Sequence, residues 1–293
     1  MKMNKSVIGV AAALAAILMV ASGCSSSGGS TSTAAVSTAD QQSEGFEIKY
    51  PESLKEQFGE SLKMEKTPER IIVMTAGPVM TLYEMGVDMV AIPNSSITEW
   101  PDDLEAERLP FGMNEIDMES IIALKPDLVI LSSTNKEKYG NTLESQGIAC
   151  YYVNAGPTVQ YEDIKTEVQI LGEAFNKKEE TDAIMKKFTD LETEMAAFKE
   201  KNGGKSVGIL FSYPPSYMQG SGGYLGDMLE KLGYVNVSDK DGQATSNAQL
   251  SMEDLIVANP DLLFAVSPTT KTGDDLKTSY EQEFANNPQT WNQ

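Results

Sequence analysis

Apolar residues follow two different spacings along this chain. Short continuous apolar runs, typical of buried strands, cover residues 70–74, 128–131, 206–211 and 262–266. Between these runs, apolar residues recur every three or four positions, which is the spacing of one helix face. Two of the helical stretches end at Gly86 and Gly233, and glycine is the residue that most often terminates a helix. Strands that alternate with helices predict an α/β fold with mostly parallel sheets.

An internal repeat divides the chain into two halves. The segments DMESIIALKPDLVI (117–130) and SMEDLIVANPDLLF (251–264) lie 134 residues apart and share six identical pairs. In each copy, Asp117 or Ser251 can cap a helix, the helix ends before a proline, and a short apolar strand follows. We therefore predict two Rossmann-like lobes of similar plan, each built on a parallel sheet.

A long helix is predicted between the two halves. Its apolar stripe consists of Ile184, Phe188, Leu191, Met195 and Phe198. At 1.5 Å per residue, a helix over residues 177–201 spans roughly 37 Å. A single backbone helix of this kind is a stiff connector, so we expect it to limit how far the two lobes can close on each other.

The second half is shorter than the first after its copy of the repeat. The first half continues with a predicted helix over 136–146 and a strand over 148–153, whereas the second has one helix near 276–284 and stops at Gln293. We interpret the second lobe as truncated at its C-terminus. A truncated lobe would leave one strand edge unpaired.

The first 24 residues have the pattern of an export signal. Lys2 and Lys5 precede an apolar run, residues 7–21, that is short for a membrane span. The run leads into Ala-Ser-Gly-Cys, which resembles the lipobox of bacterial lipoproteins and predicts lipidation of Cys24; a plain signal peptide with an incidental cysteine is the alternative. Residues 25–43 are rich in Ser, Thr, Gly and Ala and predict a flexible tether of roughly 25 Å. We therefore divide the chain into a signal peptide (1–23), a lipid-anchored disordered tether (24–45), a first lobe (46–158), connecting helices (159–203) and a second lobe (204–293).

Composition excludes several classes of function. The formal net charge is −20, and removal of Lys2 and Lys5 with the signal peptide makes it about −22, so nucleic acid is a poor partner. Histidine is absent, which excludes Ser-His-Asp and Cys-His hydrolases and metal sites built on imidazole. We expect no catalytic residue and no intrinsic cofactor.

Several sequence motifs between residues 68 and 293 resemble those of a known protein family. LYEMG, YLGDMLEKLG and the two copies of the repeat are similar to bacterial ABC-importer substrate-binding lipoproteins for iron-siderophore, haem and cobalamin. The stretches LGEAFNKK, SYMQGSGGYLGDMLEKLGYVNV and YEQEFANNP are closest to haem-receptor lipoproteins of Gram-positive uptake systems. The resemblance implies a monomeric, non-enzymatic receptor on the extracytoplasmic face of the cell membrane, which passes an iron complex, haem or a ferric siderophore, to a permease.

The same resemblance assigns a role to one acidic residue on each lobe. In this family such a residue docks onto basic residues of the permease, and the matching positions are Glu119 and Glu253 of the repeat. The alternative is that both glutamates serve only the dipole of a helix N-terminus. Their equivalent places in the two copies favour the docking role.

The resemblance also places the ligand between the lobes, on loops at the carboxyl ends of strands. The candidate ligand-binding residues are Thr75, Gly77, Trp100, Phe111, Met113, Ser132, Tyr213, Tyr217, Met218 and Thr269. These side chains are neutral, aromatic or thioether, without a basic cluster. A highly anionic ferric catecholate would need several Arg or Lys, so a flat macrocycle or a neutral ferric hydroxamate fits better.

Haem-receptor relatives ligate iron with a methionine of the first lobe and a histidine of the second. Met113 lies close to the methionine position and is the one metal-ligand candidate, while residues 265–270, where the histidine would fall, contain none. This departure argues against His-Met ligation. Tyr213 or Tyr217 could supply the missing ligand, or the ligand is another iron chelate or a corrinoid.

Two other classes of function compete with the receptor. A cell-surface enzyme with two catalytic carboxylates needs no histidine, but its carboxylates must lie about 5–10 Å apart, and we expect Glu119 and Glu253 to be much farther apart. A surface adhesion module is the other class, and the long connecting helix does not favour it.

Overall fold

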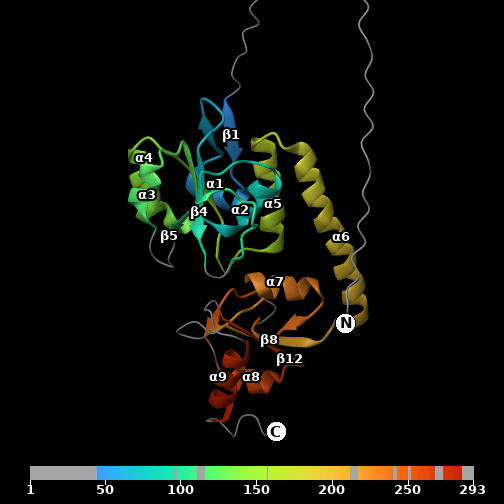
Figure 1. Ribbon diagram of the computed structural model, residues 1–293. Helices are drawn as coiled ribbons and strands as arrows, with labels where there is room; N and C mark the ends of the chain where they lie inside the picture. Colours follow the sequence, from blue (N-terminus) through green and yellow to red (C-terminus); the bar gives the residue numbers. More distant parts are fainter. Residues whose placement is uncertain are drawn as a thin grey trace, which may run out of the picture. The chain divides into compact units, whose positions relative to one another are not determined.

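The protein is described by a computed structural model. It covers residues 45–95, 98–110, 116–156, 158–211, 217–239, 243–249, 252–267 and 273–285. These residues form two α/β lobes with a long helix, α6 (Lys178–Asn202), between them in the chain (Figure 1). The predicted α/β class, the two lobes and the single backbone helix are therefore confirmed.

The first lobe contains a five-stranded parallel sheet in the order β5-β4-β3-β6-β7. Its strands are β3 (Ile71–Val73), β4 (Ala91–Asn94), β5 (Glu107–Pro110), β6 (Leu128–Ser132) and β7 (Ala149–Val153). Its α-helices are α2 (Ala76–Glu84), α3 (Met118–Ala123) and α4 (Asn141–Ser145). Helix α5 (Tyr161–Ala174), from the predicted connecting segment, packs against α2 and β1 of this lobe. Strands β3 and β6 are buried along their whole length, as parallel strands covered on both faces should be.

A small hairpin precedes this sheet. Strands β1 (Phe46–Lys49) and β2 (Ser61–Met64) are antiparallel, with helix α1 (Glu52–Phe58) between them. The Tyr50 ring stacks on Tyr151 at 4.8 Å between centroids, and the Phe58 ring stacks on Tyr152 at 4.6 Å. These aromatic pairs attach the hairpin to β7 and bury large apolar area.

The second lobe has a mixed sheet around β8 (Ser206–Phe211). Parallel partners of β8 are β10 (Val235–Asn236) and β12 (Leu262–Val266). The two-residue strands β9 (Tyr217–Met218) and β11 (Ala248–Gln249) add antiparallel pairs, which the sequence did not indicate. Its helices are α7 (Tyr224–Lys231), α8 (Met252–Ala258) and α9 (Gly273–Ala285).

The two copies of the sequence repeat also have the same local structure. Asp127 accepts hydrogen bonds from the backbone N–H groups of Glu69 and Arg70, at 2.8 and 2.9 Å, where β3 begins. Its counterpart Asp261 accepts from the N–H of Ser206, at 2.7 Å, where β8 begins. Both turns also carry a residue with positive φ at the same repeat position, Lys125 at 49° and Asn259 at 41°. The shared Pro-Asp pair therefore ties each repeat strand to the strand beside it.

The two glycines predicted as helix ends perform that role. Gly86 has φ of 64° and Gly233 has φ of 91°, a left-handed conformation that glycine adopts without strain. After each glycine, the next N–H reaches back to the last turn: Val87 donates to the Leu82 carbonyl and Tyr234 to the Leu229 carbonyl, at 2.9 and 3.0 Å.

Some predictions needed correction. The candidate ligand-binding residues Thr75 and Gly77 were expected on a loop, but Thr75 is the N-cap of α2 and Gly77 lies in its first turn. The helix predicted over 136–146 is split into a π turn (Lys136–Gly140) and α4. On the stripe of α6, Leu191 is 41% and Phe198 39% exposed, because α6 packs against α5 and α7 over part of its length only.

Strand β12 is less covered than its counterpart β6. Among the described residues, β12 has β8 as its one hydrogen-bonded strand neighbour, whereas β6 lies between β3 and β7. Leu263 and Phe264 of β12 are 37% and 38% exposed, while all of β6 is buried. The apolar run 262–266 is thus a strand, as predicted, but not a fully buried one.

Candidate functional site

A cavity of about 600 Å³ lies where β3 and β7 end. Its wall comprises residues 75–78 at the start of α2, residues 153–156 after β7, one face of α5, and Tyr224, the first residue of α7. The size suits a small molecule, and the carboxyl ends of parallel strands are where α/β proteins bind ligands. Tyr224 belongs to the second half of the chain, so residues from both halves contribute to one wall.

The cavity wall is mostly apolar, with few polar groups. One of them is the hydroxyl of Thr75, whose side chain does not cap α2 although the residue stands at the N-cap position. Its Oγ1 atom is buried and has no hydrogen-bond partner among the described residues. A buried hydroxyl without a partner costs free energy, which makes Thr75 a natural contact for a bound molecule.

The second polar group is the carboxyl of Glu167, on the face of α5 that lines the cavity. A Cβ atom placed on Gly77 would lie 3.7 Å from Glu167 Oε1, so the carboxyl points toward the first turn of α2. Burial, and to a lesser extent the neighbouring carboxylate of Asp163, raise the pKa of Glu167 to about 8. Within the described part of the chain, its oxygens accept no hydrogen bond.

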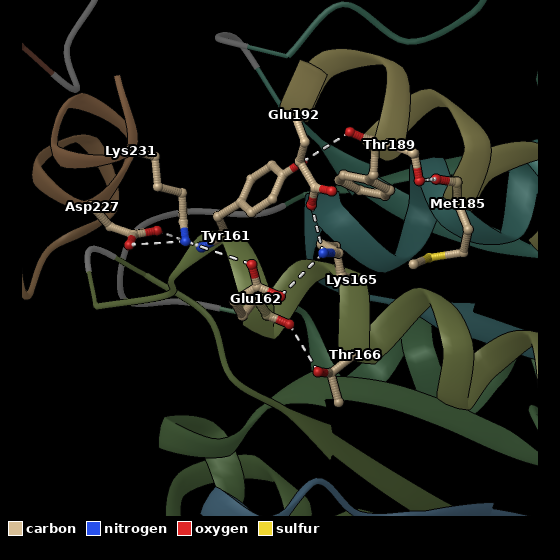
Figure 2. Close-up of polar contacts among 10 residues, drawn as sticks. Tyr161, Glu162, Lys165, Thr166, Met185, Thr189, Glu192, Asp227 and Lys231 are labelled. Carbon is tan, nitrogen blue, oxygen red and sulfur yellow. Dashed lines mark hydrogen bonds and ion pairs between the residues drawn. The ribbon is translucent and has the colours of Figure 1, made fainter. Parts of the chain in front are cut away.

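Helix α7, which brings Tyr224 to the cavity, is held against α5 by a buried hydrogen bond (Figure 2). The backbone N–H of Tyr161 donates to Asp227 Oδ2 at 2.8 Å. One turn further along α7, the ammonium group of Lys231 lies 3.5 Å from Glu162 and 3.9 Å from Asp227. It also lies 5.3 Å from the centre of the Tyr161 ring. These contacts fix the start of α7 beside the N-terminus of α5.

Helix α6 joins the same network from the other side of Tyr161. The Tyr161 ring packs edge-on against Phe188, with 5.5 Å between centroids. Lys165 of α5 pairs with Glu192 of α6 at 2.6 Å, and this pair raises the pKa of Lys165 and lowers that of Glu192 (Figure 2). Three helices from different parts of the sequence therefore meet around one tyrosine.

Of the ligand-binding residues predicted from the sequence, Thr75 and Gly77 line the cavity. Ser132 is buried and its hydroxyl is hydrogen-bonded to Thr134 Oγ1 at 2.8 Å. Trp100 donates from Nε1 to the carbonyl of Pro93 at 3.1 Å and packs against the core of the first lobe. These two residues are engaged in the fold of the first lobe and do not line the cavity.

The predicted residues of the second half also lie apart from this cavity. The Tyr217 ring stacks on Phe211 with 5.0 Å between centroids, and Met218 is buried in the core beside Leu210. The other predicted residues fall outside the described ranges; they are Cys24, Phe111, Met113, Tyr213 and Thr269.

The two repeat glutamates occupy equivalent places. Glu119 stands in the first turn of α3 and Glu253 in the first turn of α8, and both are exposed. The predicted cap of α3 is present: Asp117 accepts from the N–H of Ser120 at 3.1 Å, and Ser120 lowers the pKa of Asp117. Neither glutamate pairs with a lysine or arginine of the described residues, so both carboxylates face solvent.

Sequence reasoning missed Glu167 and Tyr224. A signal for Glu167 was available, because it is three residues after Ile164 and four before Leu171, on the apolar stripe of its helix. A glutamate on the apolar face of a helix is unusual, because glutamate is seldom buried unless its carboxyl has a partner. Tyr224 had no comparable signal, since its place at the cavity depends on long-range contacts of α7.

In the described residues, no three or more Cys, Asp or Glu side chains gather as ligands for a metal ion. The helices of this part are too short or too polar for a membrane crossing.

The chain is similar in sequence to known binding proteins. A family described as "Periplasmic binding protein" matches residues 71–292. The substrate-binding lipoprotein YvrC of Bacillus subtilis, an uncharacterised ABC transporter protein, is 23% identical over 234 residues, covering 78% of this chain and 71% of its own. The vitamin B12-binding protein of Vibrio campbellii is 28% identical over 201 residues, which cover 67% of this chain and 70% of that protein.

Solved structures share the fold. The petrobactin-binding protein YclQ of Bacillus subtilis superposes with a TM-score of 0.64 at 20% identity, covering 81% of this chain and 84% of that one. IsdE of S. aureus complexed with heme superposes with a TM-score of 0.61 at 20% identity, and the match covers 74% of this chain and 82% of IsdE.

Proposed function

The chain belongs to the periplasmic binding protein family, and from this premise we propose that it captures an iron complex, haem or a ferric siderophore, and delivers it to the permease of an ABC importer. A member of this family binds and hands over its substrate, so the chain is a binding protein and not an enzyme.

The observation that carries the proposal is the cavity of about 600 Å³ at the ends of β3 and β7. It is mostly apolar and has a few polar groups, which is the usual constitution of a small-molecule site. Relatives named for a siderophore, for haem and for vitamin B12 share this fold or sequence. The cavity would hold at least part of such a bulky ligand.

A cobalamin is the second candidate ligand. None of the described cavity residues is a lysine or arginine, and a strongly anionic chelate would lose its hydration without gaining a cation in exchange. A neutral corrinoid avoids this cost, as does a neutral ferric hydroxamate.

Attachment and docking complete the proposed role. The lipidated Cys24 and the tether 24–45 would hold the lobes, proposed as residues 46–158 and 204–293, close to the membrane. Glu119 and Glu253 would contact basic residues of the permease, and their exposed, unpaired carboxylates support this.

Titration with candidate ligands tests the function. We expect the purified full-length chain to bind at least one of haemin, a ferric hydroxamate or cyanocobalamin at micromolar concentration or below. A change in the Soret band would report haemin, and quenching of tryptophan fluorescence would report the others. Absence of binding to all three would refute the proposal.

A further inference from the structure

Two unpartnered polar groups stand in the apolar wall of the cavity. The buried Thr75 Oγ1 has no hydrogen-bond partner in the described structure, and the Glu167 carboxyl points at the same first turn of α2. Both line the cavity. A carboxyl group that faces an apolar wall loses part of its hydration, and a hydrogen-bond donor on a bound molecule would replace it.

No lysine or arginine of the described residues pairs with Glu167. The other titratable residues of the described wall are Tyr151 on β7, Asp163 on α5 and Tyr224 on α7, none of which carries positive charge. Asp163 accepts a hydrogen bond from the N–H of Gln160 at 2.9 Å and so helps to cap its own helix.

The nearby lysines are engaged elsewhere. Lys165, on the same helix, is paired with Glu192 at 2.6 Å and Glu162 at 3.2 Å. Lys231 of α7 lies between Glu162 and Asp227. The positive charge closest in sequence to Glu167 is therefore committed to the network around Tyr161, away from the cavity.

We propose that Glu167 is the residue that selects the ligand, by accepting a hydrogen bond from an N–H or O–H donor, best an ammonium group, on an otherwise apolar molecule. The hydroxyl of Thr75 binds a second polar atom of the same molecule. This inference rests on the proposed function, because it takes the cavity to be the place where the cargo binds.

The chemistry also predicts what the site rejects. Above pH 8, where Glu167 is mostly ionised, a ligand that places a carboxylate next to it brings two negative charges together without a cation, which is unfavourable in a poorly solvated wall. Haem carries two propionates, whereas a hydroxamate chelate with a free amine, or a corrinoid with amide groups, presents N–H donors. The site therefore favours a neutral or cationic chelate over haem.

A pair of ferric trihydroxamates tests the role of Glu167. Ferrioxamine B carries a free ammonium group, and the cyclic ferrioxamine E has the same iron-binding groups without it. We expect the full-length protein to bind ferrioxamine B at least about tenfold more tightly than ferrioxamine E at pH 9, above the pKa of Glu167, which is the effect of one charge-assisted hydrogen bond. Glu167→Gln should abolish this preference. Glu194→Gln, at an exposed glutamate of α6, should keep it.

Haemin supplies the opposite test. At pH 9 its affinity should rise in Glu167→Gln, because the substitution removes the carboxylate and keeps the volume, and it should not change in Glu194→Gln. Two results would overturn the inference and leave the receptor function standing: equal affinity for the two ferrioxamines in both the native chain and Glu167→Gln, or haemin as the tightest ligand of the native chain. Failure of the native chain to bind any ferrioxamine, haemin or cyanocobalamin would overturn the receptor function as well.

Discussion

A single carboxyl group connects stability and recognition in this protein. The pKa of Glu167 is raised from 4.5 to about 8 in the folded chain, mainly by burial. Between these two values the folded state holds a proton that the unfolded state has lost, so the free energy of unfolding decreases as pH rises through this window and levels off above it. The loss is at most about 1.4 kcal/mol per pH unit, and less where solvent in the cavity reaches the carboxyl.

Replacement of Glu167 by glutamine should therefore stabilise the protein. Gln has the same shape and does not titrate, so Glu167→Gln should melt at a temperature several degrees above that of the native chain at pH 8, with little difference near pH 4.5. Thermal unfolding by circular dichroism across pH 4.5–9 measures this, with Glu194→Gln as the matched control. If the native chain and Glu167→Gln showed parallel pH profiles, the carboxyl would not be buried as described.

At the scale of elements, contacts far apart in sequence decide where the cavity wall lies. Tyr224 reaches the cavity because α7 is attached to α5 through Asp227 and Lys231. The two attachments differ in strength. The Tyr161–Asp227 hydrogen bond is buried, whereas Lys231 keeps about a third of its side chain in solvent, where ion pairs contribute little.

Removal of the Asp227 acceptor should loosen both the fold and the site. Asp227→Ala leaves the buried N–H of Tyr161 without a partner, so we expect a loss of about 1–3 kcal/mol in the free energy of unfolding and weaker binding of the ligand that the titration identifies. Asp227→Asn keeps an acceptor oxygen and should retain most of the stability. Urea unfolding and the same ligand titration measure the two effects.

Lys231→Ala, one turn further along the same helix, is the matched control. It removes the partly solvated ion pairs and the contact of the ammonium group with the Tyr161 ring, and it should cost no more than about 1 kcal/mol. If Lys231→Ala proved as damaging as Asp227→Ala, the ion pairs and not the buried hydrogen bond would hold α7 in place.

Local patterns in the sequence predicted the elements well, and long-range packing limited the prediction of the site. The strands 206–211 and 262–266 have the predicted bounds, and α6 begins and ends within one residue of its prediction. These features depend on periodicity and on helix-ending residues, which are local. Trp100 and Met218 are aromatic and thioether residues near predicted loops, yet Trp100 packs against the core of the first lobe and Met218 is buried in the core of the second. Residue type at a loop does not reveal which way a side chain points.

At the scale of the whole molecule, the repeat places equivalent surface groups on the two lobes. Glu119 and Glu253 stand one residue after the start of equivalent helices, exposed and without a partner among the described residues. Neither packs in the cavity, and the helices that carry them begin in matching turns of the repeat. Changes at these positions should therefore leave the ligand site intact.

Charge reversal of both glutamates separates docking from binding. The double variant Glu119→Lys/Glu253→Lys should keep the ligand affinity of the native chain within about twofold and abolish ligand-dependent uptake by cells, because like charges would meet at the permease surface. Each single variant should reduce uptake in part, since one contact would remain.

Net charge must be controlled in this experiment, because the chain carries −20 and the double variant changes that by four units. Glu56→Lys/Glu194→Lys makes the same change at two exposed glutamates of α1 and α6 and should transport normally. Normal uptake in both double variants would refute the docking role. Loss of uptake in both would attribute the effect to overall charge. The docking role is supported if uptake is lost in Glu119→Lys/Glu253→Lys but not in Glu56→Lys/Glu194→Lys, and if the first variant still binds ligand. In that case each lobe of this protein makes one contact with the permease.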